Sequence, residues 1–307
     1  METRQLGGDG PALSVIGLGC NNFGMKLDRD ASAAVINAAL EAGITHLDTA
    51  EMYGGGKSEE FIGATLGARR DEVVLATKFL PRPKDEPYSP GALRRRIIEG
   101  CEGSLRRLRT DRIDLYYQHY PDVEAPAEEA LQALDELVQQ GTILHIASSN
   151  VTAAQVETAA GIAESALLTR FCGTQIEWNL LSRAVELDVV PSAHANKVGI
   201  VPYFPLASGM LTGKYRRGQE YPRGSRFDAM SYFADKVVSE ENFARVEALT
   251  AFAQERGHTI LELAVAWLAA QDGVASVITG ATTPEQVRAN AAAASWRLTA
   301  EELAAVP

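Results

Sequence analysis

The stretch THLDTAEMYGGGKSEEFIG, residues 45–63, joins an apolar run to a carboxylate, a tyrosine and a glycine turn. Residues 45–48 have the composition of a buried strand, yet this run ends on Asp48, and Tyr53 follows five residues later. A helical run beginning near Ser58 comes after the three glycines 54–56. A strand that ends on a charge and leads through a loop into a helix is typical of a β-α unit whose strand end faces a functional site.

Short β-branched or apolar runs alternate with longer helical runs along the whole chain. The helical runs carry apolar residues every three to four positions. Strict alternation indicates parallel strands with right-handed crossovers, and eight strands close into a barrel. The predicted strands are residues 14–19, 45–48, 73–78, 113–118, 143–149, 173–177, 199–204 and 276–280.

An open doubly wound sheet is the alternative arrangement. Its first strand usually leads into a Gly-x-Gly-x-x-Gly turn, whereas this chain reads GLGCNNFG, with Asn22 in the place of the third glycine. The prediction is therefore an α/β chain of one domain, residues 1–307, folded as a (β/α)8 TIM barrel. Residues 1–15 are expected to form an N-terminal β-hairpin below the barrel, and an extra helix is expected at the C-terminal end.

Helix ends are marked by capping residues and glycines. Gly43 and Gly141 stand where a helix must turn into the left-handed conformation. The segment 205–238 is the longest one without a regular pattern, and long loops of this kind tend to be functional. The predicted N-terminal caps are Asp30, Ser58, Thr152, Ser239 and Thr283.

Composition and charge exclude several classes of protein. The chain of 307 residues has a formal net charge of −11 and no face rich in Lys and Arg, which argues against nucleic acid as a partner. It has neither a signal-peptide core nor an apolar run long enough to span a membrane. Cys20, Cys101 and Cys172 show no metal-ligand spacing, so reduced thiols and a cytoplasmic location are expected.

Polar side chains stand at the ends of successive predicted strands. Asp48 ends the second strand, Lys78 the third, and His119 follows the fourth. Taken singly, these residues have ordinary interpretations as a helix cap, a solvated strand end and a core or loop histidine. Together at one rim they are costly unless they compensate one another, which favours a catalytic site.

Several motifs resemble those of the aldo-keto reductase family. They begin with LDTAEMYGGGKSEEFIG at residues 47–63 and VVLATK at 73–78. The others follow in the family's order at residues 114–122, 147–150, 175–179, 209–215 and 277–290, so that the resemblance covers nearly the whole chain. The fold that it implies is the same barrel.

This resemblance implies a catalytic tetrad of Asp48, Tyr53, Lys78 and His119. The implied reaction is hydride transfer between a nicotinamide and a carbonyl carbon, with Tyr53 as proton donor. A neighbouring ammonium, Lys78, would lower the phenol pKa from its usual value of about 10. Asp48 would hold Lys78 charged, and His119 would orient the carbonyl. No metal is required.

The resemblance also implies contacts to a dinucleotide, with carboxamide, ring, pyrophosphate and adenosine each held by a different part of the rim. The predicted cofactor contacts are Cys20, Asn21, Asp48, Ser149, Asn150, Gln175, Tyr203, Phe204, Pro205, Leu206, Ala207, Ser208, Leu211, Gly213, Lys214, Arg226, Gly280, Ala281, Thr282, Gln286 and Asn290. The predicted substrate contacts are Asn22, Phe23, Met52, Phe79, His119 and Trp178.

The cofactor and the activity leave alternatives open. NADPH is expected, but Thr282 stands where many family members carry an Arg or Lys for the 2′-phosphate, so NADH is the alternative. The expected substrate is a small aldehyde, ketone or sugar carbonyl. An alcohol or sugar dehydrogenase working in the oxidative direction is a second interpretation. An NADP(H)-binding regulatory subunit resembling potassium-channel β subunits is a third, against which His119 speaks. The oligomeric state is left open.

Overall fold

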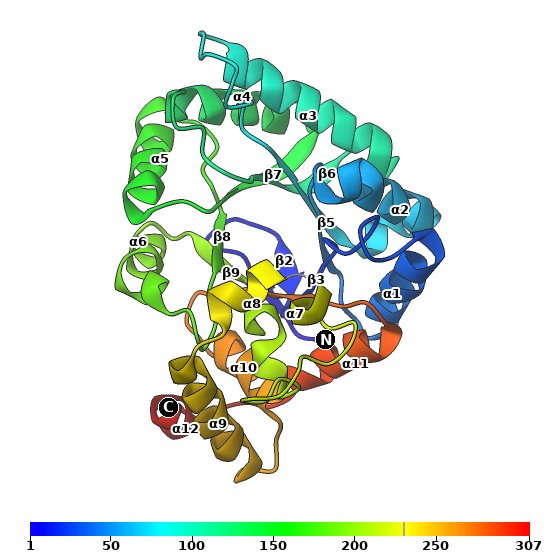
Figure 1. Ribbon diagram of the computed structural model, residues 1–307. Coiled ribbons are helices and arrows are strands. Elements are labelled where there is room, and N and C mark those ends of the chain that lie inside the picture. The colour runs from blue at the N-terminus through cyan, green and yellow to red at the C-terminus, as the bar shows by residue number, and fades with distance from the viewer. Residues whose placement is uncertain (230) are drawn as a thin grey trace.

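A computed structural model describes residues 1–229 and 231–307. Eight parallel strands form one sheet in the order β10-β3-β4-β5-β6-β7-β8-β9 (Figure 1). A parallel bridge between Ile200 and Val274 brings the two outer strands together, so that the sheet nearly closes as a barrel. The strands are β3 (Ile16–Gly19), β4 (His46–Asp48), β5 (Val74–Phe79), β6 (Ile113–Gln118), β7 (Ile143–Ser149), β8 (Gly173–Glu177), β9 (Gly199–Tyr203) and β10 (Val277–Gly280).

These strands confirm the predicted (β/α)8 TIM barrel, and a ring of helices surrounds the sheet (Figure 1). The ring includes α1 (Arg29–Glu41), α2 (Lys57–Leu66), α3 (Ala92–Leu108), α4 (Ala127–Gln139), α5 (Ala153–Ala166), α6 (Val189–Ala195), α10 (Ile260–Ala269) and α11 (Pro284–Ala293). Helix α9 (Glu240–Gln254) packs on the outer side of α10. A short C-terminal helix, α12 (Ala300–Ala305), follows. No helix in the described ranges is long and apolar enough to cross a membrane.

The segment predicted to be irregular, 205–238, contains three helical pieces. A 3₁₀ turn, Ala207–Thr212, is followed by α7 (Arg226–Ala229) and α8 (Ser231–Val237). These short pieces escaped the sequence pattern because each is shorter than the roughly 11–18 residues over which a helical period can be recognised. Helices α7 and α8 lie over one end of the barrel in Figure 1, which places them above the ends of the strands.

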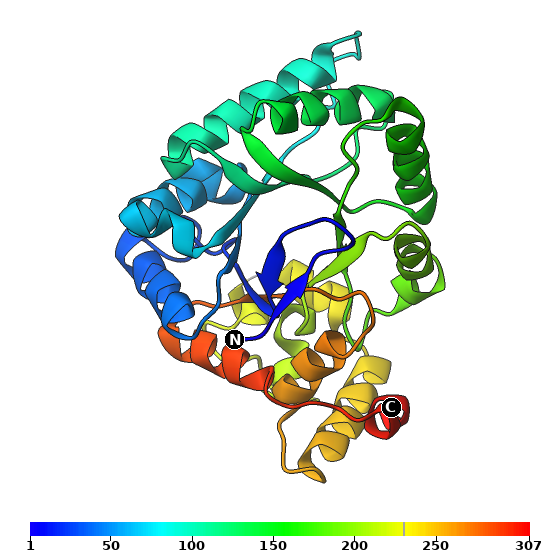
Figure 2. The same cartoon turned by 180° about the vertical axis from the view of Figure 1, so that it is seen from behind.

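The N-terminal hairpin, β1 (Thr3–Gln5) and β2 (Ala12–Ser14), closes the opposite end of the barrel (Figure 2). Leu6 is fully buried there, against two strand-starting glycines. A Cβ atom at Gly199 would lie 2.3 Å from the Gly7 nitrogen, and one at Gly173 would lie 2.7 Å from Cδ2 of Leu6. Glycine at these positions therefore lets the hairpin seal the barrel floor.

Three of the predicted helix caps are confirmed, and two are wrong. Thr152, Ser239 and Thr283 each accept a backbone hydrogen bond at the start of their helix. Helix α1 is capped by Asp28 rather than by Asp30. Helix α2 starts after Gly56, whose φ of 93° turns the chain, so Ser58 lies inside the first turn instead.

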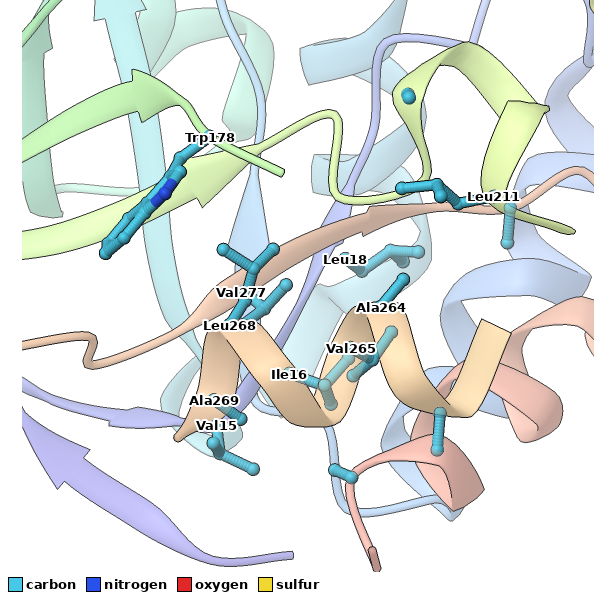
Figure 3. Packing of buried hydrophobic residues seen from close by; sticks show 14 of the residues in the cluster. Val15, Ile16, Leu18, Trp178, Leu211, Ala264, Val265, Leu268, Ala269 and Val277 are labelled. Carbon is cyan, nitrogen blue, oxygen red and sulfur yellow. The ribbon is translucent and has the colours of Figure 1, made fainter. Parts of the chain in front are cut away.

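The largest hydrophobic cluster lies between the barrel wall and the helices outside it. Figure 3 shows α10 packing against strands β3 and β10 in this cluster. Helix α10 is apolar on nearly every side because the sheet, α9 and α11 all pack on it. The labelled contacts include Ile16, Leu18, Ala264, Val265, Leu268 and Val277.

Candidate active site

A buried ion pair joins the ends of the neighbouring strands β4 and β5. The Lys78 ammonium lies 2.5 Å from Oδ1 of Asp48 and also donates to the carbonyl of Thr49 at 2.8 Å. Lys78 is fully buried, which acts to lower its pKa, but the Asp48 carboxylate, together with Tyr53 and Cys20, leaves the pKa raised. Lys78 is therefore held as an ammonium ion inside the barrel.

The second oxygen of the same carboxylate is held from across the barrel. Gln175, on β8, donates from Nε2 to Oδ2 of Asp48 at 2.8 Å. Both oxygens of Asp48 thus have a fixed partner, so the carboxylate cannot rotate without breaking one bond. Gln175 was predicted as a cofactor contact, and the structure places it on the Asp48 carboxylate as well as on the cavity wall.

The loop after β4 brings Tyr53 next to Lys78. Tyr53 begins a 3₁₀ turn in which Gly54 and Gly55 have φ values of 59° and 65°. This left-handed backbone suits glycine, and a Cβ atom at Gly54 would lie 2.6 Å from the Phe23 carbonyl. Burial raises the pKa of Tyr53, while the charge of Lys78 acts against that rise, so the phenol is protonated at neutral pH.

His119 completes the group from the end of β6. Its ring centre is 5.9 Å from that of Tyr53, at an angle of 84°, and it stacks on Tyr120 at 4.7 Å. Burial lowers the pKa of His119 to about 3, and the charge of Lys78 acts in the same direction. The imidazole is therefore neutral and can donate one hydrogen bond without carrying charge.

A cavity of about 1010 Å³ opens above this group, and Asp48, Tyr53 and His119 form part of its wall. Lys78 lies beneath it. The rest of the wall contains most of the residues predicted to contact the cofactor. Those that line it are Asn21, Ser149, Asn150, Gln175, Tyr203, Phe204, Pro205, Leu206, Ser208, Lys214, Arg226, Gly280, Ala281, Thr282, Gln286 and Asn290. Asn22 and Met52, predicted to contact substrate, line it too.

Amide and hydroxyl groups on this wall are fixed by hydrogen bonds. Tyr203 donates to Oδ1 of Asn150 at 2.8 Å, and Nδ2 of Asn150 donates to the carbonyl of His119 at 3.0 Å. The hydroxyl of Ser149 donates to the carbonyl of Gln175 at 3.0 Å. The ends of strands β7, β8 and β9 thus present an ordered polar surface on the same cavity wall as Asp48, Tyr53 and His119.

A second part of the wall is positively charged. Lys26, Lys214 and Arg226 line it together. The pKa of Lys26 is lowered by partial burial and by the charges of Arg226 and Lys214, as is expected of cations that share one cavity wall. In a chain with a net charge of −11, this local cluster is suited to an anion such as a phosphate.

Some predicted contacts lie outside the cavity wall. Phe79 follows the inward-pointing Lys78 on β5, so it points outward and packs on Tyr116 at 5.2 Å. The Trp178 indole donates to Glu186 at 2.9 Å. Phe23 is fully buried in the main cluster. The structure therefore does not support these substrate contacts. Of the predicted cofactor contacts, those outside the wall are Cys20, Ala207, Leu211 and Gly213.

Other residues on the wall were missed by the sequence pattern. Tyr120, Tyr232 and Lys236 lie on it, and the two tyrosines are among the exposed large side chains. Tyr232 and Lys236 belong to the segment 205–238 that was singled out as functional, which was the available signal. The remaining missed residues are Gly19, Lys26, Leu27, Glu177, Gly209, Thr212, Gly224, Ser225, Leu261, Ile278 and Ala289.

A phenol beside a fixed ammonium is an arrangement suited to proton transfer. Within residues 1–229 and 231–307, no group of three or more His, Cys, Asp and Glu side chains is placed to hold a metal ion. Cys20, Cys101 and Cys172 are separate buried thiols.

Comparison with known proteins gives a consistent result. The family model of the "Aldo/keto reductase family" matches residues 15–307. An aldo-keto reductase of Bacillus subtilis, YhdN, is 35% identical over 98% of this chain and 91% of its own length. Probable voltage-gated potassium channel β subunits of Arabidopsis thaliana and Oryza sativa are 34% and 35% identical, each over 94% of this chain and 90% of its own length.

Proposed function

Because the chain belongs to the aldo/keto reductase family, we propose that it is an NADP(H)-dependent oxidoreductase that reduces an aldehyde or ketone to an alcohol. The observation that carries the proposal is the buried pair of Lys78 and Asp48 beside Tyr53, at the base of a cavity large enough for a cofactor and a substrate. When bound, the nicotinamide would supply the hydride.

The residues of the chain then handle the proton. As negative charge develops on the carbonyl oxygen, Tyr53 donates its phenolic proton to that oxygen. The ammonium of Lys78 stabilises the phenolate that remains, and Asp48 keeps the ammonium in place. Neutral His119 donates a hydrogen bond that orients the carbonyl group. In the oxidative direction the same groups act in reverse.

The polar wall supports a dinucleotide at this position. Ser149, Asn150 and Gln175 offer amide and hydroxyl groups near the nicotinamide, and the Tyr203 ring offers a stacking surface. Lys26, Lys214 and Arg226 offer charge to the phosphates. Thr282 and Gln286 offer hydrogen bonds at the adenosine end, but both side chains are neutral. They also bond to each other, because the amide nitrogen of Thr282 donates to Oε1 of Gln286 at 2.7 Å.

Two titrations and one assay test the proposal. Purified protein is titrated with NADPH and NADH by cofactor fluorescence, and carbonyl compounds are screened for NADPH oxidation. Binding of NADPH with a lower dissociation constant than NADH, together with turnover of at least one carbonyl, is expected. Tighter binding of NADH would overturn the cofactor preference. The three free thiols support a cytoplasmic location as part of this proposal.

The similarity to probable channel β subunits favours a second candidate, a cofactor-binding regulatory subunit. Such a protein would bind NADP(H) with little turnover and act through a partner. His119 argues for the enzyme, because it supplies the neutral donor that carbonyl reduction uses. Tight cofactor binding without turnover across a broad panel of aldehydes, ketones and sugars would favour the regulatory subunit.

A further inference from the structure

Helix α2 begins directly behind the two strands that carry Asp48 and Lys78. Its first turn contains Ser58 and Glu59, both fully buried. Ser58 donates to the Cys20 carbonyl at 2.9 Å and lies 2.8 Å from Oγ1 of Thr49. Because a serine hydroxyl has one hydrogen, Thr49 is the donor in the second bond. Glu59 accepts a hydrogen bond from Oγ1 of Thr77 at 2.6 Å.

The two threonines are the direct sequence neighbours of catalytic residues. Thr49 follows Asp48, at the end of β4, and Thr77 precedes Lys78 on β5. Successive side chains of a strand point to opposite faces, so each threonine points outward where its neighbour points into the barrel. Helix α2 therefore holds both strands from outside at the level where the ion pair joins them from inside.

The contact to β5 is built around a buried charge. The Glu59 carboxylate has no exposed side-chain surface, and its second oxygen accepts from Nε of Arg107, on α3, at 2.6 Å. Glycines give this arginine its space, since a Cβ atom at Gly56 would lie 2.9 Å from its Cδ atom and one at Gly103 would lie 3.0 Å from its Nη1 atom. A buried ion pair adds little net stability, so a role in fixing geometry accounts for it better.

We propose that Ser58 and Glu59 are positioning residues, which fix the separation between the strand end that carries Asp48 and the strand position that carries Lys78. The inference rests on the proposed function. The segment 48–59 starts on β4, passes through Tyr53 and returns through Glu59 to β5. Any displacement of β5 would move the Lys78 ammonium relative to the phenol, and catalysis is sensitive to displacements of this kind.

Replacement of Thr77 tests the proposal with the least disturbance. Thr77→Val removes the bond to Glu59 and leaves the pair of Glu59 and Arg107 intact, whereas Thr77→Ser restores a hydroxyl. The matched control is Thr169→Val, because Oγ1 of Thr169 also donates to a carboxylate, Asp135, at 2.6 Å, but in the loop before β8. Thr49→Val provides a second, independent variant on the other strand.

The expected result is a loss of kcat of about tenfold or more in Thr77→Val, with the cofactor KM changed less than about twofold. The basic limb of the pH profile for carbonyl reduction should move to higher pH, because a displaced ammonium lowers the phenol pKa less. Thr77→Ser should recover most of the activity and the wild-type pH profile. Thr169→Val should retain the wild-type kcat and pH profile.

Circular dichroism and cofactor titration establish that each variant is folded, and Thr49→Val replaces Thr77→Val if the latter does not fold. A folded Thr77→Val protein with wild-type kcat and pH profile would show that the bond serves stability alone, and would overturn the proposal. So would a fall in kcat that Thr77→Ser does not repair. Wild-type protein that turns over no carbonyl would instead refute the proposed function, and this role with it.

Discussion

The Nζ atom of Lys78 lies 5.3 Å from the centre of the Tyr53 ring. The same ammonium contacts Asp48 at 2.5 Å. The charge is therefore close both to the phenol that we propose as proton donor and to the carboxylate that holds it in place. Substitutions of these two partners should have different consequences.

Tyr53→Phe removes the proton donor and little else. Carbonyl reduction should fall by about 10²–10⁴-fold in kcat, since that is the usual contribution of a positioned acid. Cofactor affinity, measured by fluorescence titration, should change less than about twofold. A variant that keeps more than about a tenth of wild-type kcat would exclude Tyr53 as the acid.

Asp48→Asn leaves the Lys78 ammonium buried without its counter-charge. We expect a loss of about 3–5 kcal/mol in the free energy of unfolding, measured with urea, because an unpaired buried charge is strongly destabilising. The double variant Asp48→Asn, Lys78→Met should recover a large part of the loss. Equal stability of the single and double variants would show that the unpaired Lys78 ammonium is not the cause of the lost stability.

Buried His46 should make the protein less stable in acid. Its Nδ1 atom lies 2.9 Å from the Ser276 hydroxyl, and burial lowers its pKa to about 4. The unfolded chain binds the proton below about pH 6.5, so this contribution is complete above that pH and is lost as the pH falls towards 4. The loss amounts to roughly 3 kcal/mol. Urea unfolding at several pH values should show that the free energy of unfolding changes less with pH over this window in His46→Gln than in wild type.

Two glycine substitutions should have opposite effects. Gly199→Ala places a Cβ atom against the hairpin backbone and Leu6, so we expect a loss of about 2 kcal/mol or more in the free energy of unfolding. Gly161 lies in α5, and nothing lies within 4 Å of the position that an added methyl group would take. Gly161→Ala should therefore stabilise the protein by up to about 1 kcal/mol. Thermal unfolding of both variants tests the pair.

Lys26→Gln should weaken binding of NADPH, because it removes one cation from the cluster that Lys26, Lys214 and Arg226 form on the cavity wall. An increase of about tenfold in the dissociation constant, roughly 1.4 kcal/mol, is expected at low salt. The difference from wild type should shrink as salt is added, since exposed charges are screened. Lys84→Gln, which changes a lysine outside the cavity wall, is the control and should bind as wild type does.

The strands and the strand-end residues Asp48, Lys78 and His119 could be predicted from local rules, whereas the place of Tyr53 in the group was implied by the family resemblance. Each strand is a short apolar run, and parallel strands bring their ends to one rim. Phe79 could have been excluded by the same alternation, since it follows Lys78. The two-residue alternation of side chains along β5 would have placed Phe79 on the outer face, whereas the family motif placed it in the cavity.

Other features depend on contacts between distant segments, which no local pattern contains. Ser58 has the residue type of a helix cap, but Gly56 starts the helix and leaves the serine to bond to the barrel. Lys26 lines the same cavity wall as Lys214 and Arg226, which lie much further along the sequence. Asp30 was expected as a cap because aspartate is a common residue type at that position. Asp28, however, has the extended backbone that a cap requires.

The hairpin below the barrel closes the lower end of the barrel interior. Leu6 fills the lower opening, and the hairpin backbone packs directly against Gly199 at the start of β9. Molecules that reach the site from above must also leave from above, past α7 and α8. If a dinucleotide lies beneath the substrate at the upper opening, binding and release are ordered: the carbonyl compound binds last, and its alcohol leaves first.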